Sequence, residues 1–555
     1  MILFPMDMLK RVLGEISVGD ELNLEEYLDF LLKKYKEVEN NNLAQIVYSN
    51  IGGDRFFGLD YVDASGSRRI DMKELRTEAQ KLARYFRDNG VGKGDRVGVL
   101  LPKCPPLIIT ALALWQLGAV YVPLFTAFGT DAISFRAIDS EAKFIVTNMA
   151  NEGKVGDDVR ASSKVMVVDS DTYDRGVVLG DALKSEALDE FVSISPNDYI
   201  VIIYTSGTTG SPKGVPVPLW AVAALESYMT LGIGLRPTDT YWNMADPGWA
   251  YGLYYGVVAP LAMGFGILFL NIPFDPNRVE EVWREHRITN FAGAPTAYRA
   301  MRMAIGNRKV ESFLERMSSA GEPLNPEVIE WVHNSLGVEI RDHYGQTENG
   351  MMINNHFDPR LALPVQPGSM GKAALGFRAV LVDGNFNELG DGVDGEVAID
   401  TSASPLFWFP NYYRNEEKSK ERFSPDMRYY LTGDVASRNS DGYFYFSGRS
   451  DDVISTAGYR VGPFEVESAI MTHPAVAECA VIGVPDELRG EAICAYVVLR
   501  NGLEGSEDLA EEIRQVVRDR MSKTSYPRYV RFVETLPKTP SGKIQRFLLR
   551  REEAN

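Results

Sequence analysis

Short apolar runs alternate with longer amphipathic stretches through the first 200 residues of the chain. Residues 72–89 carry apolar side chains at helical spacing, and Gly90 follows them as a typical helix stop. Residues 96–101, 144–146, 164–168 and 199–203 are short and rich in β-branched side chains, which predicts buried strands. Such alternation predicts a mainly parallel sheet with helices on both faces, and strands expected at 267–270 and 338–340 extend the pattern.

The pattern changes twice towards the C-terminus. Residues 378–445 have shorter strands and many Gly, Asp and Asn turns, which predicts a small antiparallel β region. Beyond residue 452 we expect helices at 464–472 and 507–521 and strands at 476–484 and 492–499. We therefore predict an α/β fold: an N-terminal domain, residues 1–450, with two mainly parallel sheets, helices and a small β region, then a small α+β domain, residues 451–555.

Composition excludes several classes of protein. A length of 555 residues suggests about two to four domains. A net charge of −18 argues against nucleic acid as a partner, because phosphates would be repelled. Cys104, Cys479 and Cys494 form no C-x-x-C pair, so neither a disulfide framework nor a zinc site is indicated.

The first residues carry no basic region before their apolar side chains and do not resemble a signal peptide. Two uncharged stretches, 107–125 and 249–274, are interrupted by glycine and proline, so we interpret them as buried helices, turns and strands without an integral membrane segment. Together with the few cysteines, this predicts a cytoplasmic location.

A loop rich in glycine and hydroxyl groups directly follows the strand expected at 199–203. Glycines allow backbone N–H groups to turn towards an anion, hydroxyls add donors, and a lysine adds positive charge. The loop is not a Walker A motif, because Gly214 follows its lysine where that motif requires Ser or Thr. A surface linker is the alternative, but we predict a polyphosphate-binding segment, called here the phosphate loop: Thr205, Ser206, Gly207, Thr208, Thr209, Gly210, Ser211, Pro212 and Lys213.

Five further polar clusters follow the phosphate loop along the chain. Each alone is compatible with an ordinary turn or a solvated tail. Their order and number make the set specific. They are residues 321–323 (GEP), 342–348 (DHYGQTE), 430–434 (YLTGD), 448–452 (GRSDD) and 537–543 (PKTPSGK).

With the phosphate loop, these clusters resemble the adenylate-forming acyl-CoA synthetase family over nearly the whole chain, most closely its medium-chain branch. The resemblance implies a ligase that uses ATP, Mg²⁺ and coenzyme A. A carboxylate is a poor electrophile, so it is first joined to AMP with release of pyrophosphate and then transferred to the CoA thiol. The small C-terminal domain is implied to move between the two half-reactions, with Asp451 as the hinge.

The resemblance also implies roles for residues of this sequence. The phosphate loop wraps the β- and γ-phosphates, and Thr208 and Glu348 hold Mg²⁺, which prefers oxygen ligands. Asp434 accepts hydrogen bonds from the ribose, and Lys543 acts catalytically during adenylation with Glu348 and Thr208. The other implied nucleotide contacts are Gly321, Glu322, Pro323, Asp342, His343, Tyr344, Gly345, Gln346, Thr347, Arg449 and Arg460. His343 is expected to pack in the wall rather than act as a base, because an ionised carboxylate needs no deprotonation.

The acid and CoA sites are implied less completely. Acetate-type relatives carry a tryptophan where this chain has Gly345, so we expect an acyl channel that is open there and lined also by Trp249, Tyr251, Gly252 and Gly293. This favours a medium-chain or branched fatty acid, or a compact aromatic acid. The candidates for CoA are Ala457, Gly458, Tyr459, Arg489, Arg518, Tyr526 and Arg528. Ala457 stands where relatives often have Ser, which removes one hydroxyl contact.

Other functions stay open at this stage. An aryl- or benzoate-type CoA ligase, an enzyme that loads a carrier-protein thiol, and an adenylate-using oxygenase would share the ATP site. A non-catalytic nucleotide-binding protein is disfavoured by the presence of both Glu348 and Lys543. The sequence specifies neither the acid nor the oligomeric state.

Overall fold

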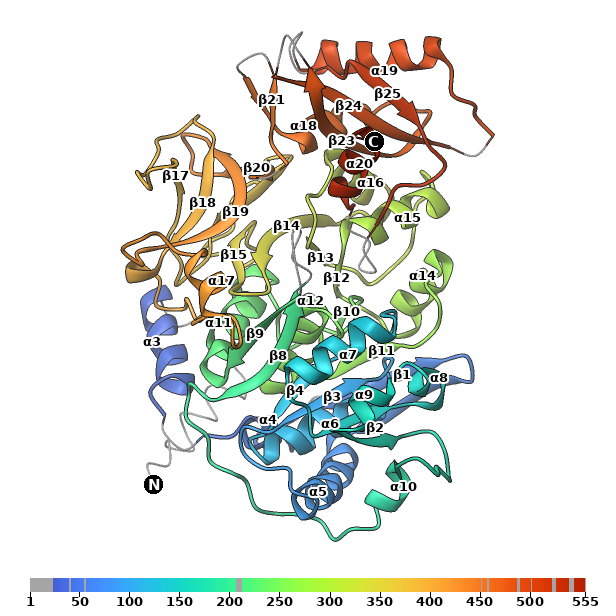
Figure 1. Cartoon of the computed structure of the whole chain (residues 1–555), viewed down its shortest axis with the longest axis vertical. Helices are drawn as coiled ribbons and strands as arrows, with labels where there is room; N and C mark the ends of the chain where they lie inside the picture. The colour runs from blue at the N-terminus through green and yellow to red at the C-terminus, as the bar shows by residue number, and fades with distance from the viewer. Residues whose placement is uncertain are drawn as a thin grey trace.

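A seven-stranded sheet is built from the first 220 residues (Figure 1). The computed structural model describes residues 23–38, 41–53, 56–205, 212–450, 452–456, 459–486, 490–500, 502–521, 526–538 and 544–554. Neighbouring strands are parallel except for the last pair, which is antiparallel. The order is β7 (Val177–Val178), β6 (Lys164–Val167), β5 (Phe144–Thr147), β3 (Arg96–Leu100), β4 (Val120–Pro123), β8 (Tyr199–Thr205) and β9 (Lys213–Pro218).

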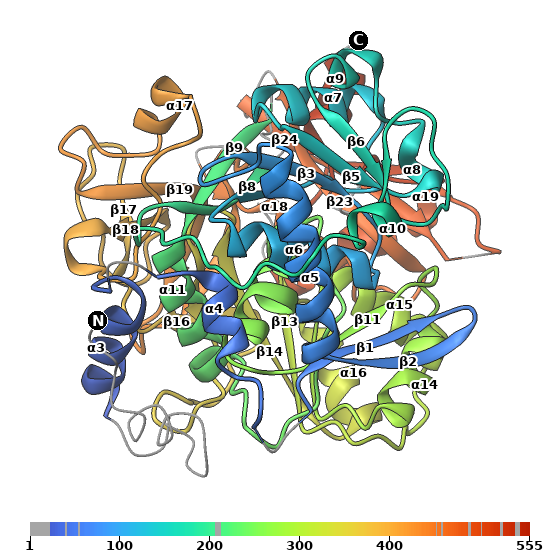
Figure 2. The ribbon, with the colours of Figure 1, turned by 90° about the horizontal axis from the view of Figure 1, so that it is seen from below.

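Helices cover both faces of this sheet, as the sequence predicted (Figure 2). Helices α5 (Met72–Asp88) and α6 (Pro105–Gln116) pack on one face, against Val97 and Val99 of β3. Helices α7 (Thr130–Asp139) and α9 (Asp157–Arg160) pack on the other, against β4 and β6. Successive side chains of a strand point to opposite faces, so a strand buried on both sides has the continuous apolar runs noted above.

A ten-stranded sheet joins the second parallel region to the antiparallel region. Its strands are parallel from β10 to β14 and antiparallel from β14 to β17. The small β region expected from the sequence is therefore continuous with the second sheet. The order is β10 (Tyr241–Asn243), β12 (Asn290–Gly293), β13 (Arg316–Ala320), β14 (Glu339–Gln346), β15 (Gly350–Asn354), β16 (Ser369–Ala373), β20 (Phe444–Arg449), β19 (Tyr429–Arg438), β18 (Gly395–Asp400) and β17 (Ala379–Val382).

The uncharged stretches lie inside the core. The second forms α12 (Ala250–Leu253), a π-helical turn η3 (Tyr254–Val258), α13 (Ala259–Ala262) and β11 (Ile267–Leu270), and β11 pairs with β1 (Gly58–Asp63), which pairs with β2 (Gly66–Asp71). In the described part of the chain, no helix has the length and apolar character needed to cross a bilayer. The three cysteines are free thiols.

The described C-terminal residues form a separate five-stranded sheet with three helices. They are β21 (Ile454–Thr456), β22 (Tyr459–Val461), β23 (Val476–Asp486), β24 (Gly490–Leu499), β25 (Tyr529–Phe532), α18 (Pro463–Ile470), α19 (Glu507–Arg520) and α20 (Arg546–Ala554). Phe464 of α18 makes an edge contact with Phe446 of β20, their ring centroids 6.3 Å apart. The predicted boundary at Asp451 lies outside the described residues and stays a prediction.

Glu467 of α18 is the main buried charge of this C-terminal unit. It accepts a hydrogen bond from the backbone N–H of Val481 at 2.8 Å and two from Arg546 Nη2 of α20, at 2.6 and 2.8 Å. Arg546 and Arg550 also pair with Asp452, beside the predicted hinge. One buried carboxylate therefore joins a helix, a strand and the C-terminal helix.

Replacing Glu467 by Ala is expected to cost about 3–5 kcal/mol, because it leaves the Arg546 guanidinium with only the longer ion pair to Asp452. Thermal and urea unfolding would measure this. The matched control is Glu511→Ala, which removes the ion pairs of an exposed carboxylate on α19 and should leave the unfolding midpoints nearly unchanged. Equal losses for the two variants would contradict the importance of the buried pair.

Candidate active site

The two strands that flank the phosphate loop are paired up to its edges. Thr205, the last residue of β8, lies opposite Lys213, the first residue of β9. Residues 206–211, with the predicted Mg²⁺ contact Thr208, lie outside the described residues. The Lys213 ammonium sits 5.1 Å from the centroid of the Tyr412 ring. Burial, and secondly the charge of Arg422, lower the pKa of Lys213. Two cations placed so close favour an anionic ligand.

Asp434 of β19 is held by donors from two strands. Its Oδ2 accepts from the Tyr344 hydroxyl at 2.5 Å and from Gln346 Nε2 at 2.7 Å, both on β14. Its Oδ1 pairs with Arg449 Nη1 of β20 at 3.0 Å. Gly433 has φ +72°, and a Cβ there would lie 3.1 Å from Arg449 Nη2, so this glycine allows the close approach. The structure thus brings together four of the predicted nucleotide residues.

Glu348 is buried beside this group and is oriented by a residue that the sequence interpretation missed. The Tyr412 hydroxyl donates to Glu348 Oε1 at 2.7 Å. Glu348 Oε2 accepts no hydrogen bond from the described residues, which leaves one carboxylate oxygen for a cation. No group of three metal-binding side chains occurs in the described part of the chain. The free oxygen of Glu348 suits Mg²⁺, which proteins often hold by one carboxylate together with the phosphates of the substrate.

The predicted adenine wall is ordered around Asp342. Its Oδ2 accepts from the backbone N–H of Leu324 at 3.2 Å, which ties β14 to the loop after Pro323. Its Oδ1 is buried and has no partner among the described residues. Burial raises the pKa of Asp342 well above its usual range. An amine donor of a bound base would satisfy this oxygen.

Two neighbours of Asp342 serve mainly the fold. Glu322 accepts from Thr296 at 2.9 Å and from Arg299 at 3.0 Å, so its side chain ties the loop at Gly321, Glu322 and Pro323 to α15 (Pro295–Ile305). His343 lies between the Tyr228 hydroxyl, 2.7 Å away, and the Asn355 carbonyl, 3.1 Å away. Burial lowers the pKa of His343 to about 3, so the ring is neutral, which supports a packing role.

The predicted acyl-site glycines approach other parts of the chain closely. A Cβ on Gly345 would lie 2.1 Å from the Gly350 carbonyl, and one on Gly252 would lie 2.2 Å from the Asp246 carbonyl. Gly293 faces the rings of Tyr298 and Phe291. The open acyl channel expected at Gly345 stays a prediction, and in the structure the missing side chain allows β14 and β15 to meet.

The remaining acyl candidates are aromatic. Trp249 packs against Phe125 and Phe128, with ring centroids 5.3 and 5.5 Å away. Tyr251 is 5.7 Å from Tyr255, and burial raises the pKa of Tyr251 to about 12. Aromatic rings therefore surround these candidate acyl residues.

Three of the CoA candidates form one cluster on the C-terminal unit. The ring of Tyr526 lies 4.2 Å from the Arg518 guanidinium and 4.6 Å from that of Arg528. Arg518 also pairs with Glu511. The other predicted residues are not placed: Asp451, Ala457, Gly458, Arg489 and Lys543 lie outside the described residues, as do the side chains of Tyr459 and Arg460.

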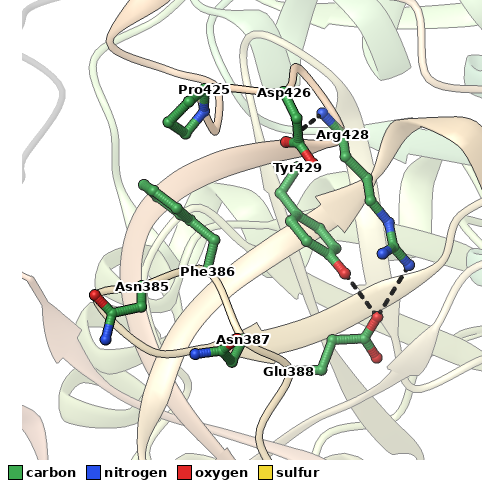
Figure 3. A pocket seen from close by; sticks show the side chains of 8 residues that line it. All are labelled: Asn385, Phe386, Asn387, Glu388, Pro425, Asp426, Arg428 and Tyr429. Carbon is green, nitrogen blue, oxygen red and sulfur yellow. Dashed lines mark hydrogen bonds and ion pairs between the residues drawn. The ribbon is translucent and has the colours of Figure 1, made fainter.

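A surface pocket lies between the loop that follows β17 and the segment that leads into β19 (Figure 3). Its lining groups already bond to one another. The Tyr429 hydroxyl donates to Glu388 Oε1 at 2.8 Å, and the Arg428 backbone N–H donates to Asp426 Oδ1 at 3.2 Å. It contains none of the predicted site residues, so the nucleotide site is assigned to the polar cluster on β14, β19 and β20.

Comparisons with known proteins identify the family of this chain. Residues 56–406 match the model of the AMP-binding enzyme family, and residues 465–543 match that of the AMP-binding enzyme C-terminal domain. The chain belongs to the AMP-binding enzyme family. It is an acid–thiol ligase of the AMP-forming acyl-CoA synthetase class, which uses ATP, Mg²⁺ and coenzyme A.

Relatives of this ligase cover nearly the whole chain. Acetyl-coenzyme A synthetase of Bacillus subtilis is 36% identical over 508 residues, which are 90% of this chain and 87% of that protein. Mitochondrial acyl-coenzyme A synthetase ACSM3 of Rattus norvegicus is 34% identical over 515 residues, 89% of this chain and 86% of that protein. An acyl-CoA synthetase structure from Brucella canis is 40% identical, with a TM-score of 0.74, and covers 96% of this chain and 98% of that chain.

A further solved structure has a higher TM-score to this chain than the Brucella canis structure but a lower sequence identity. The anthranilate CoA ligase AuaEII in complex with anthranoyl-AMP has a TM-score of 0.84 at 26% identity, and covers 93% of this chain and 98% of that chain. These names span small aliphatic and aromatic acids, so membership of the family leaves the acid open.

Replacing Tyr412 by Phe should lower kcat/KM about 10- to 100-fold and raise the Mg²⁺ concentration needed for half-maximal rate, because Glu348 loses the donor that orients it. A magnesium titration of the adenylation rate would measure both effects. The neighbouring Tyr413→Phe is the control, since no described hydrogen bond uses that hydroxyl. An unchanged magnesium requirement in Tyr412→Phe would contradict the assignment.

Proposed function

We propose that this ligase activates a compact carboxylic acid, either a branched fatty acid of up to medium length or a small aromatic acid. The acid becomes an acyl-adenylate and then a CoA thioester. The observation that carries this proposal is a cluster of tyrosine rings directly behind the motif strand β14.

The cluster comes from the π-helical turn η2 (Tyr228–Gly232), from α12 and from the π-helical turn η3. The ring centroids of Tyr228 and Tyr255 are 4.5 Å apart, and Tyr251 lies 5.7 Å from Tyr255. The Tyr255 hydroxyl accepts from the Met351 backbone N–H at 3.0 Å, and Tyr254 donates to the Thr347 carbonyl at 3.0 Å. These contacts anchor the rings beside the residue predicted to meet the α-phosphate. We expect rigid rings at this place to limit the length of the acid, which would favour a short, wide acid over a long straight chain.

Acetate is disfavoured because no large side chain at Gly345 closes the site. A tryptophan there would need β14 and β15 to separate, because its Cβ would meet the Gly350 carbonyl. Gly345→Trp would therefore test strand pairing together with acid preference, and variants of the tyrosine cluster are the cleaner test.

The geometry supports a simple adenylation step. A carboxylate oxygen of the acid attacks the α-phosphorus of ATP, the P–O bond to pyrophosphate breaks, and no proton is transferred. Lys213 would bind the leaving pyrophosphate, Asp434 the ribose, and Thr347 the α-phosphate. Mg²⁺, held by Glu348 and the predicted Thr208, supplies charge neutralisation for the phosphates when bound.

The second step would use a different placement of the C-terminal unit. The CoA thiolate attacks the acyl carbonyl carbon, and AMP leaves with the bonding electrons. We propose that Asp451 is the hinge between a domain of residues 1–450 and one of residues 451–555. Lys543 would act in adenylation only, and the cluster of Arg518, Tyr526 and Arg528 would meet the phosphates of CoA.

Thioester formation across acids of increasing size should favour branched five- to eight-carbon acids or benzoate-type acids over acetate by at least about tenfold in kcat/KM. Each methylene buried contributes about 0.8 kcal/mol until the acid meets the rings. Acetate as the best substrate, or a rate that keeps rising to long straight chains, would contradict the proposal.

A substitution in the tyrosine cluster tests whether these rings determine which acid the enzyme prefers. Tyr251→Ala should shift the optimum towards longer acids, whereas Tyr85→Ala on α5, distant in the fold, should not. An unshifted optimum in a folded Tyr251→Ala enzyme would remove the ring cluster as the determinant.

Replacing Lys543 by Ala should reduce adenylation at least 100-fold and leave thioester formation from supplied acyl-adenylate nearly unchanged, because the lysine is needed in one placement of the C-terminal unit only. Single-turnover assays of the two half-reactions would measure this. Equal loss in both half-reactions would count against two alternating placements.

A further inference from the structure

Several hydrogen bonds hold Arg422, the cation whose charge lowers the pKa of Lys213, beside the nucleotide site. Arg422 follows α17 (Glu416–Lys420), and its Nη2 donates to the Tyr430 hydroxyl at 2.9 Å, to the Thr432 carbonyl at 3.0 Å and to Gln346 Oε1 at 3.0 Å. No carboxylate lies within ion-pair distance of Arg422 among the described residues. Its hydrogen bonds, rather than an ion pair, therefore have to explain its position.

The bonds of Arg422 determine which way the Gln346 amide faces. A guanidinium can only donate and an ionised carboxylate can only accept. Gln346 Oε1 faces Arg422 and the Tyr430 hydroxyl, 3.0 Å away, while Nε2 donates to Asp434 Oδ2 at 2.7 Å and to the Thr432 carbonyl at 2.8 Å. The opposite amide orientation would set NH₂ against the guanidinium and oxygen against the carboxylate and the Thr432 carbonyl, which removes those three bonds and adds repulsion.

The amide in turn holds the carboxylate that is expected to meet the ribose. Asp434 accepts hydrogen bonds from Tyr344 and Gln346 on one oxygen and from Arg449 on the other. A carboxylate with three donors has a single favoured orientation, and removing one donor allows it to rotate. Arg422 reaches Asp434 only through Gln346.

We propose that Arg422 is a positioning residue that orients Gln346, and through it Asp434, so that the site discriminates ribose from deoxyribose. This inference rests on the proposed nucleotide site. It assigns to Arg422 an indirect role in ribose selection and no contact with the nucleotide.

The experiment compares ATP, 2′-deoxy-ATP and 3′-deoxy-ATP as substrates of adenylation in the full-length enzyme. The wild type should prefer ATP to at least one deoxynucleotide by about tenfold or more, as expected for a hydrogen bond to a charged group. Arg422→Met should reduce that preference to below about threefold. It should raise the KM for ATP more than it lowers kcat.

Control variants separate positioning from general damage. Arg428→Met makes the same change at an arginine that pairs with Glu388 and Asp400, away from Gln346, and should keep the preference. Arg422→Lys should restore part of it, since an ammonium can donate to Gln346. If Arg422 acts through Gln346, Arg422→Met in a Gln346→Leu background should cause no further loss of preference.

The outcomes are distinguishable. An equal loss of rate with all three nucleotides in Arg422→Met would show a merely structural role and overturn the inference, as would additive losses in the double variant. Asp434→Asn tests the site itself: if that variant keeps the wild-type preference, the proposed ribose contact fails. If Asp434→Asn loses the preference and a folded Arg422→Met keeps it, only the role of Arg422 fails.

Discussion

The site depends on one carboxylate that joins two distant strands. Asp434 lies 90 residues after Tyr344 in the chain, and three other strands separate β19 from β14 in the sheet. The 2.5 Å hydrogen bond between their side chains therefore links β14 and β19, which are not paired through their backbones. The sheet changes from parallel to antiparallel pairing at β14, and the Tyr344 and Gln346 side chains at the end of that strand reach Asp434 within β19.

Charge is distributed for an anionic substrate despite a net charge of −18. Lys213, Arg422 and Arg449 come from separate segments and gather around Glu348 and Asp434. Each acid in the group has a described donor, and Asp342 retains one buried oxygen without a partner. A buried polar group without a hydrogen-bond partner destabilises the folded protein unless a ligand supplies that partner. The nucleotide would supply both the missing donor and the missing anion.

Much of the fold could be predicted from the sequence, because its strands are buried on both faces and its helices are strongly amphipathic. The strand at 267–270 has the predicted bounds, and the helix at 72–89 ends one residue earlier than predicted. The motifs also identified the residues that converge at Asp434. Tyr412 and Arg422 were missed because their roles arise from tertiary approach, and neither lies in a cluster that was singled out. The close approach of the Gly350 carbonyl to Gly345 could not be predicted either, because a sequence shows that a side chain is absent but not which atoms lie in its place.

The central claim is that this cluster joins an organic acid to a nucleotide. Exchange of labelled pyrophosphate into ATP, with magnesium and without CoA, measures that step alone. The account predicts exchange that requires a compact acid and is lost when Asp434 is replaced by Ala. Exchange that stays absent across a broad panel of acids, or that continues undiminished in the Asp434→Ala enzyme, would contradict it.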